Sequence, residues 1–379
     1  MLNIVIVNCF DTYEDRIDLL HSYFDRRGYN VKIIQSNFRH IKKIYRNDKK
    51  KDFIFLETKP YYKNLSASRM ISHFNFSKEA FNYIEKIKPN ILYVVLPPNS
   101  LAYFASKFKK KNKDIKLVFD IIDLWPETMP FGKIKTLPPF NFWKAMRDKS
   151  LKFADYIITE CDLYQTILEK ELFNLRTKTV YLAQKNDFTN IKSNPKLPNN
   201  EINLCYLGSI NNIIDIQKIK EIVEKINYNK PTTLHIIGEG EKKSTLINEI
   251  KEVGANVKYY GKIYDFHIKQ EIFDICHFGI NIMKDTVCVG LTMKSIDYFR
   301  HGLPIINNIK ADTQKLVDKY NIGINIIGDN INEVVYKILN TSEKELYNMR
   351  QNSVNLFNNL FTQKVFENKI DLIIKELSL

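Results

Sequence analysis

Short apolar runs alternate with amphipathic stretches of helix length along most of the chain, and this alternation limits the fold more than any other feature. Residues 3–7 form an apolar run, 14–27 have helical periodicity that ends at Gly28, and 31–35 form a second apolar run. Further apolar runs lie at 53–56, 91–96, 117–122 and 156–159, with helical stretches at 77–87 and 100–110. Runs of this length between helices predict parallel strands that helices cover on both faces.

A polar, proline-bearing segment divides this pattern into two series. Residues 186–200, NDFTNIKSNPKLPNN, have the composition of a linker. A second series then begins at 203–207 and runs into Gly208, with helical stretches at 216–226 and 242–253 and apolar runs at 233–237, 257–260 and 278–283. We therefore predict an α/β protein of two doubly wound, Rossmann-like domains, 1–185 and 201–361, facing a central cleft at the carboxyl ends of their sheets. The last helix, at about 362–379, is free to pack back onto the first domain.

The net positive charge of the chain comes from its first 200 residues. Residues 1–200 carry 35 Lys and Arg against 21 Asp and Glu, whereas residues 201–379 carry 22 of each. Compositional bias alone would affect both halves alike. The excess therefore favours a surface for phosphate groups, on lipid headgroups, a lipid-linked diphosphate or nucleic acid. No recognised nucleic-acid-binding motif accompanies it, so we expect no nucleic-acid partner.

The cysteines and the apolar runs indicate the compartment. The five cysteines are widely spaced and include no C-x-x-C pair, which argues against a zinc site or a disulfide framework. No apolar run approaches the ~20 residues that a membrane-spanning helix needs. The opening residues, MLNIVIVNCF, lack the basic region and cleavage site of a signal peptide. The expected location is the cytoplasm, with peripheral attachment to the inner face of the plasma membrane left open.

The segment 290–306, GLTMKSIDYFRHGLPII, is the densest functional signal. A glycine-bearing loop enters a helix at about 293–300, Gly302 ends that helix, and an apolar run follows Pro304. The start of such a helix carries unpaired N–H groups and the positive end of the helix dipole. It is therefore suited to bind a diphosphate.

Two charged residues of this helix point to a nucleotide. Lys294, in the first turn, can add a positive charge beside the anion. Asp297 lies three residues later on the same helix face, where its carboxylate can accept hydrogen bonds from ribose hydroxyls. The alternative is that Lys294 is a solvated surface charge and that Asp297 only balances the helix dipole.

This segment resembles the donor motif of glycosyltransferase family 4 and its GT-B relatives, which ends in Glu-Ala-Met-Ala-x-Gly-x-Pro-Val. Residues 297–305, DYFRHGLPI, match that frame, with Asp297 at the position of the second glutamate. Residues 292–294, TMK, fall where one branch has Pro-Ser-Lys, whose lysine and backbone amides face the donor diphosphate. Three more segments follow the family order: LHIIGEG at 234–240 is similar to the strand before a Gly-x-Gly turn, VKYYGKI at 257–263 to the segment that meets the nucleobase, and DLWPE at 123–127 to a signature of a polysaccharide-synthesising branch.

The resemblance implies an enzyme, a hexosyltransferase of surface polysaccharide synthesis such as capsule formation. It would move a sugar from a nucleotide donor, expected to be UDP-linked, to a glycan or lipid-linked acceptor, with retention at the anomeric carbon. No metal is expected, because helix dipoles and basic groups neutralise the leaving diphosphate in that family and the sequence has no clustered metal signature. The implied donor-binding residues are Gly208, Ser209, Gly238, Lys262, Ile263, Gly290, Leu291, Thr292, Met293, Lys294 and Asp297.

Two departures from the family pattern bear on activity. The first glutamate of the family's Glu-x7-Glu pair would fall at Val289, so sugar recognition differs or Asp285 supplies the carboxylate. The Gly-Arg…Lys diphosphate clamp after the first strand of the second domain is also missing, since Ser209 follows Gly208. Lys294 and backbone amides must therefore carry more of the phosphate charge.

Candidate acceptor residues lie in the first domain. Asp123 and Glu127 follow the apolar run 117–122, at the sheet edge where such folds bind ligands. A carboxylate there can orient the acceptor hydroxyl or take its proton, and the resemblance points to Asp123 as the catalytic group. Glu127 is expected on the acceptor side, as are Asn8 and Asp11 from the segment that replaces the family's glycine-rich turn. The structural alternative makes Asp123 a buried helix cap and Glu127 a helix-start residue.

Two stretches of the first domain have the composition of a membrane-facing surface. Residues 106–116, SKFKKKNKDIK, form a basic segment, and 138–153, PPFNFWKAMRDKSLKF, interleave aromatic side chains with cations. A helix beginning near Asn141 would place the aromatics on one side, as in an interfacial anchor. The alternative is that these aromatics pack into the domain. The expected partners are thus a nucleotide-sugar, a glycan or lipid-linked acceptor and an anionic membrane, with a homo-oligomer left open.

Two other functions remain open. A nucleotide-sugar epimerase shares the GT-B fold but would need a second set of cleft carboxylates, which the sequence does not place. A non-catalytic GT-B partner subunit is favoured slightly by Val289 and by the missing clamp. Only the enzyme would release nucleoside diphosphate from its donor.

Overall fold

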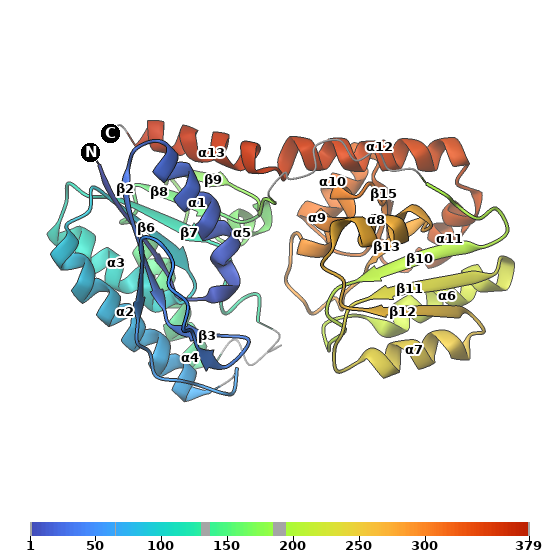
Figure 1. Ribbon diagram of the computed structural model, residues 1–379, viewed down its shortest axis with the longest axis horizontal. Coiled ribbons are helices and arrows are strands. Elements are labelled where there is room, and N and C mark those ends of the chain that lie inside the picture. Colours follow the sequence, from blue (N-terminus) through green and yellow to red (C-terminus); the bar gives the residue numbers. More distant parts are fainter. Residues whose placement is uncertain (1, 65, 130–136, 185–194, 378–379) are drawn as a thin grey trace. The chain divides into compact units, whose positions relative to one another are not determined.

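The protein is described by a computed structural model over residues 2–64, 66–129, 137–184 and 195–377. It divides into two compact units (Figure 1). The N-terminal unit comprises Met1–Ala183 and Gln363–Leu379, and the C-terminal unit comprises Gln184–Thr362. Most of the expected linker, residues 186–194, lies outside the described residues.

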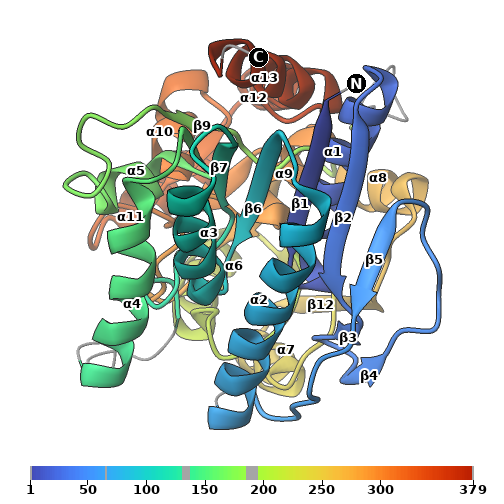
Figure 2. The ribbon, with the colours of Figure 1, turned by 90° about the vertical axis from the view of Figure 1, so that its left-hand side faces the viewer.

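The N-terminal unit is built on a seven-stranded parallel sheet with the order β5-β2-β1-β6-β7-β8-β9. Helices α2, α3 and α4 lie side by side over one face (Figure 2), and α1 and α13 pack together against the other, where their apolar side chains join the core. The strands are β1 (Asn3–Asn8), β2 (Asn30–Ser36), β5 (Phe53–Leu56), β6 (Ile91–Leu96), β7 (Lys116–Ile121), β8 (Tyr156–Thr159) and β9 (Thr177–Thr179). The helices are α1 (Glu14–Arg26), α2 (Ala67–Ile87), α3 (Asn99–Lys111), α4 (Pro138–Leu151), α5 (Asp162–Ile167), α13 (Gln363–Glu376) and the 3-10 turn η1 (Asp11–Tyr13).

A short hairpin leaves the carboxyl end of β2. Its strands are β3 (Phe38–Arg39) and β4 (Ile44–Tyr45), which pair antiparallel. The sequence analysis did not predict this hairpin, because its strands are too short to produce a periodic pattern.

The C-terminal unit is built on a six-stranded parallel sheet with the order β12-β11-β10-β13-β14-β15. The order reverses between β10 and β13, which creates the crevice at the carboxyl ends where such sheets bind ligands. The strands are β10 (Ile202–Leu207), β11 (Thr232–Ile237), β12 (Asn256–Gly261), β13 (Phe278–Asn281), β14 (Ile305–Asn307) and β15 (Gly323–Asn325). The helices are α6 (Ile216–Asn229), α7 (Lys243–Glu252), α8 (Phe266–Asp274), α9 (Met293–Arg300), α10 (Asp312–Tyr320), α11 (Ile331–Asn340) and α12 (Glu343–Leu360).

Two expected helix starts are wrong. Helix α2 begins at Ala67 instead of residue 77, because Ser66 caps it and accepts a hydrogen bond from the backbone N–H of Arg69 at 3.2 Å. Helix α4 begins at Pro138 instead of near Asn141. Proline is favoured in the first turn of a helix, where its missing N–H leaves no bond unmade.

The aromatics of α4 are divided between the two interpretations, an outward face and packing into the domain. Trp143 is buried and packs against Trp125, with ring centroids 5.5 Å apart, whereas Phe142 is 71% exposed. Among the described residues, no helix is both long and apolar enough to cross a membrane.

Candidate functional site

A cleft of about 290 Å³ opens at the carboxyl ends of the strands of the C-terminal unit. The turns after β10, β11 and β12 and one side of α8 and α9 line this cleft. Its lining residues are Gln184, Leu207, Gly208, Ser209, Ile237, Gly238, Glu239, Lys262, Ile263, Tyr264, Lys269, Met293, Lys294 and Asp297. Eight of the eleven predicted donor-binding residues are therefore brought together here.

Two glycines let the turns after β10 and β11 approach each other closely. Gly208 has φ +117° and Gly238 has φ +149°, values that disfavour any residue with a side chain. A Cβ added to Gly238 would lie 1.9 Å from the carbonyl oxygen of Gly208. Only glycine fits at position 238, and its backbone is therefore exposed at the wall of the cleft.

The remaining three predicted residues hold the start of α9 and do not line the cleft. Thr292 is the N-cap, accepting from the N–H of Ser295 at 3.2 Å and donating to Oδ1 of Asn281 at 3.1 Å. The carbonyl of Gly290 accepts from the backbone N–H and the hydroxyl of Thr313, at 2.9 and 2.7 Å. Leu291 is buried beside them. These contacts fix where the first turn of α9 points.

Lys294 carries a buried ammonium group for which the described residues provide no hydrogen-bond partner. Its Nζ lies 4.9 Å from the centre of the Tyr206 ring, a cation–π contact that offsets only part of the lost hydration. Burial lowers the pKa of Lys294 to about 7. The interpretation of Lys294 as a solvated surface charge is therefore wrong. A buried cation without an anion, in a lined cleft, is a site that lacks its counter-charge.

Asp297 is held by a residue that the sequence analysis missed. Nζ of Lys269, on α8, lies 2.6 Å from Oδ2 of Asp297, and the carboxylate is 16% exposed at the cleft wall. Oδ1 lies 3.7 Å from Nδ1 of His301. Lys269 could not be found from a motif, because it becomes part of the site only through the packing of α8 against α9.

His301 occupies the C-cap of α9. Its Nδ1 lies 2.8 Å from the carbonyl oxygen of Asp297, and its ring stacks on Phe266 with centroids 4.2 Å apart. Burial lowers the pKa of His301 to about 4, so the ring is neutral near pH 7 and supports α9 instead of supplying charge to the cleft.

The two positions expected to bear on sugar recognition stand apart from this lining. Asp285 is exposed in the loop after β13, and Val289 is half-buried. Neither lines the cleft.

In the N-terminal unit, the two DLWPE carboxylates have different surroundings. Asp123 accepts hydrogen bonds from Nε1 of Trp125 at 2.7 Å and from the hydroxyl of Thr128, and burial raises its pKa despite these bonds. Glu127 pairs with Arg147 at 2.8 Å and with Lys144 at 3.2 Å. Burial disfavours the charged form of Glu127, but the hydrogen bonds and charge of Arg147, a backbone hydrogen bond and the charge of Lys144 together lower its pKa. Burial thus favours the neutral form of Asp123, whereas Glu127 is an ion-pair partner.

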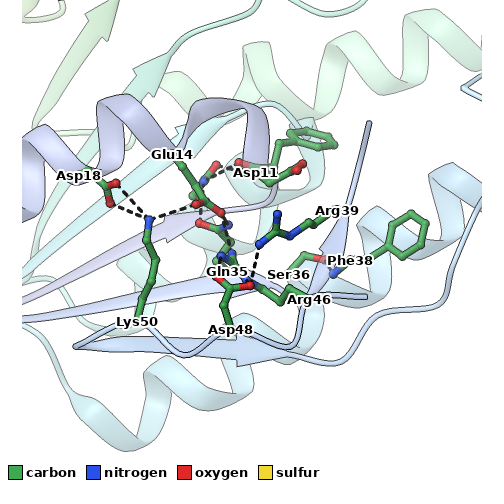
Figure 3. Close-up of polar contacts among 12 residues, drawn as sticks. Asp11, Glu14, Asp18, Gln35, Ser36, Phe38, Arg39, Arg46, Asp48 and Lys50 are labelled. Carbon is green, nitrogen blue, oxygen red and sulfur yellow. Dashed lines mark hydrogen bonds and ion pairs between the residues drawn. The ribbon is translucent and has the colours of Figure 1, made fainter. Parts of the chain in front are cut away.

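Asn8 and Asp11 make structural contacts at and just after the end of β1, and Asp11 also holds the turn of the β3–β4 hairpin. Asn8 is fully buried, and its Nδ2 donates to the carbonyl of Phe10 at 2.8 Å and to Oε1 of Gln35 at 3.0 Å. Oδ1 of Asp11 accepts from the backbone N–H of His40, in the hairpin turn, at 2.8 Å. Figure 3 shows that Gln35 also contacts Glu14, in a polar network that continues through Arg46 to Asp48.

One group among the described residues has the geometry of a metal site. Possible ligand atoms of His21, Asp25 and Asp52 lie within 4.8 Å of one another. Asp52 is already paired with Lys32 at 2.9 Å. The trio belongs to the N-terminal unit and includes no predicted site residue.

Solved structures with this architecture match the chain over its whole length. A sucrose-phosphate synthase from Thermosynechococcus elongatus gives a TM-score of 0.70 at 11% identity, covering 100% of this chain and 99% of its own. The lipopolysaccharide outer core galactosyltransferase WaaB gives 0.68 at 13%, covering 99% and 100%. Anabaena HepE in complex with UDP gives 0.66 at 12%, covering 100% of both chains. At these identities the similarity establishes the fold, which is GT-B, with two Rossmann-like domains.

A family match adds the class of activity. Residues 206–371 match the model of the glucosyltransferase 3-like, C-terminal domain family, a span that includes every predicted donor-binding residue. No curated protein sequence matches the chain significantly. The family match of this segment, together with the GT-B fold, indicates that the chain is a glycosyltransferase.

Proposed function

We propose that the chain transfers a hexose from a UDP-linked donor to a glycan or lipid-linked acceptor during surface polysaccharide synthesis, such as capsule formation. The observation that carries the donor half is Lys294, a buried and unpartnered ammonium group at the first turn of α9, in a cleft lined by Gly208 and Gly238. HepE, whose fold is similar, is solved with UDP and with UDP-glucose, which supports a uridine nucleotide for this cleft.

The diphosphate would bind at the start of α9. Lys294 would neutralise one phosphate, and the free N–H groups of the first helical turn and of the turn at Gly208–Ser209 would donate to its oxygens. The ammonium would then gain the anion that the described residues do not provide. The departing diphosphate carries more charge than the bound donor, so the same contacts stabilise the transition state. No metal is required by this scheme.

The nucleoside would lie along the strand ends. The carboxylate of Asp297, oriented by Lys269 at 2.6 Å, would accept hydrogen bonds from the ribose hydroxyls. The backbone at Lys262 and Ile263, which line the cleft after β12, would contact the base. Met293, 48% exposed in the same lining, would supply apolar contact.

The N-terminal unit would bind the acceptor, with Asp123 orienting the attacking hydroxyl or taking its proton. A carboxylate whose pKa is raised is a better base than one whose charge is stabilised by an ion pair, which supports Asp123 over Glu127. In the transfer, the acceptor oxygen bonds to the anomeric carbon, the bond from that carbon to the diphosphate oxygen breaks, and the hydroxyl proton leaves. Retention would follow if the diphosphate itself receives that proton on the face it leaves.

We further propose that the enzyme works in the cytoplasm, attached to the inner face of the plasma membrane through its N-terminal unit. The charge excess of residues 1–200 supports attraction to anionic lipid. Apolar side chains that are exposed near the starts of α2 and α4 support shallow insertion: Ile71 is 53% exposed, Phe74 42% and Phe142 71%.

The proposal is tested by nucleoside diphosphate release. Purified protein should release UDP from at least one of a panel of UDP-hexoses, slowly with water and faster with the correct acceptor, and Lys294→Met should depress that release. Stabilisation in a thermal-shift screen identifies the donor. A chain that binds no nucleotide-sugar and releases no diphosphate from any would instead be a non-catalytic partner subunit.

A further inference from the structure

The N-terminal unit contains a second buried cation without a counter-ion. Five arginines are buried among the described residues, and four of them lie within salt-bridge distance of a carboxylate: Arg16 with Asp120, Arg46 with Glu14 and Asp48, Arg147 with Glu127 and Asp148, and Arg350 with Asp274. The fifth, Arg69 on α2, has no carboxylate partner in the described part of the chain. Taking a charged group out of water is costly unless an opposite charge compensates.

The surroundings of Arg69 are aromatic. Its guanidinium carbon lies 4.5 Å from the centre of the Trp125 ring and 5.7 Å from those of Phe10 and Tyr61. Nη1 donates to the carbonyl of Asn64 at 2.7 Å, but Nε has no hydrogen-bond partner in the described structure. Aromatic faces hold a guanidinium in place without neutralising it. The group keeps both its charge and unused donors.

Two histidines and a lysine add further donors beside Arg69. Nδ1 of His40 lies 2.8 Å from the Tyr61 hydroxyl and Nε2 of His73 lies 3.4 Å from it, while Nδ1 of the buried His73 has no partner among the described residues. Nζ of Lys43 lies 4.7 Å from the centre of the Tyr61 ring. Burial, together with the positive charges of Arg69 and Lys43, lowers the pKa of His40 to about 3 and that of His73 well below its usual value. The positive charge of this cluster therefore comes from Arg69 and Lys43, and the histidines contribute neutral donors near pH 7.

The chain holds the cluster in place from two sides. The hairpin turn that carries His40 and Lys43 is tied to Asp11 at the His40 N–H, and the hairpin's far end is tied down by Arg46, which pairs with Glu14 and Asp48 at 2.6 Å each (Figure 3). Phe10 follows β1, the hairpin follows β2 and Trp125 follows β7, so the cluster lies at the carboxyl edge of the sheet, where this kind of fold binds ligands.

We propose that Arg69, with His40, Lys43 and His73, forms a binding subsite for a phosphate-type anion of the acceptor. This proposal rests on the proposed function, because it assigns the acceptor to the N-terminal unit. Burial raises the pKa of Asp123 and, among weaker opposing influences, the charge of Arg69 lowers it, so the two side chains are within electrostatic range. An acceptor phosphate on Arg69 would therefore be held near the carboxylate proposed to handle its hydroxyl. Four donor-bearing side chains suit the several oxygens of a phosphate.

The intrinsic fluorescence of Trp125 tests the subsite directly. The chain has two tryptophans, so Trp143→Phe leaves Trp125 as the only reporter, stacked over Arg69. Titration with inorganic pyrophosphate should change its emission with saturation. Arg69→Gln should weaken that response at least about tenfold, as expected for lost hydrogen bonds to a charged group, and Arg69→Lys should weaken it less.

Three controls keep the result interpretable. Lys294→Met removes the other proposed diphosphate site and should leave the Trp125 response intact. Circular dichroism verifies the fold of Arg69→Gln. If that variant does not fold, Lys43→Gln, at a half-buried position, takes its place in the test and should also weaken the response. UDP binding by the wild type, measured separately, tests the donor site alone, so failure of one proposal is distinguishable from failure of the other.

The source of the phosphate is decided by comparing probes. A response to pyrophosphate in solution supports a phosphate carried by the acceptor itself. A response only to phosphatidylglycerol vesicles, absent from phosphatidylcholine vesicles, supports a lipid headgroup on the same side chains. Equal pyrophosphate affinity in the wild type, Arg69→Gln and Lys43→Gln would overturn the subsite, as would no Trp125 response to any of these probes.

Discussion

Nζ of Lys269 lies 2.6 Å from Oδ2 of Asp297, and this ion pair joins α8 to α9 at the wall of the proposed donor cleft. Both side chains are largely buried, at 11% and 16% exposed. The pair therefore orients the carboxylate that we propose for the ribose.

Asp297→Asn should weaken UDP binding more than Lys269→Met does, because the aspartate is proposed to touch the nucleotide and the lysine only positions it. The two changes should be non-additive, with a coupling of about 0.5–3 kcal/mol in a double-mutant cycle. Calorimetric titration of UDP into the four proteins measures both. Fully additive effects would show that the ion pair does not orient the binding carboxylate.

Gly238→Ala should destabilise the C-terminal unit by at least about 1–3 kcal/mol and abolish UDP binding, because its Cβ would lie 1.9 Å from the Gly208 carbonyl oxygen at an unfavourable φ. Gly328→Ala is the matched control: Gly328 also has positive φ, but its Cβ would meet nothing within 4 Å. Urea unfolding of both variants separates the steric cost from the cost of the backbone angle. Similar losses in the two would contradict the close approach of the turns.

Asp123→Asn should lower sugar transfer at least about a hundredfold, the usual scale for losing a general base, while leaving UDP affinity unchanged. Transfer rates and UDP titrations on the same preparation provide the comparison. Transfer at the wild-type rate would remove Asp123 from the mechanism.

Glu127→Gln should act on stability instead. It leaves the fully buried Arg147 with only Asp148 as a carboxylate partner, which should cost about 3 kcal/mol near pH 7. The folded-state pKa of Glu127 is lowered, so the ion pair's contribution is complete above the ordinary pKa of 4.5 and is lost as the pH falls through the folded value. Unfolding curves of the wild type and Glu127→Gln should therefore converge in acid. A gap that persists at low pH would assign the loss to packing.

Membrane attachment should depend on charge. Vesicles with phosphatidylglycerol should sediment the protein at low salt and release it at high salt, because screening weakens the attraction between surface charges. Ile71→Ser and Phe142→Ser should each reduce sedimentation if these exposed side chains insert. Equal binding to phosphatidylcholine vesicles would exclude an electrostatic contribution.

The parts of the fold that local patterns determine were predictable from the sequence. Helix α9 spans Met293–Arg300 as expected, since Thr292 caps its start and Gly302 follows its end. The strands that lead into the cleft, β10 and β11, were also located, because short apolar runs ending in glycine indicate buried parallel strands.

The environments of the site residues could not be predicted from the sequence, because they depend on contacts between distant segments. The burial of Lys294 requires Tyr206 on β10, and the pairing of Asp297 requires Lys269 on α8. That Arg69 has no carboxylate partner among the described residues is visible only when its surroundings are known. The proposed roles of Lys294 and Arg69 thus depend on the lack of a carboxylate partner among the described residues. A sequence motif does not show this lack.

The central claim is that Lys294 neutralises the donor diphosphate, and proton uptake on UDP binding tests it most directly. With a pKa lowered by burial to about 7, Lys294 is mostly neutral at pH 8, and a bound diphosphate would restore its charge. Titration calorimetry at pH 8 in buffers of different ionisation enthalpy should show uptake of up to about one proton per UDP in the wild type. Lys294→Met should show no such uptake and at least about tenfold weaker binding. Equal affinity and equal proton exchange in the two proteins would contradict the account.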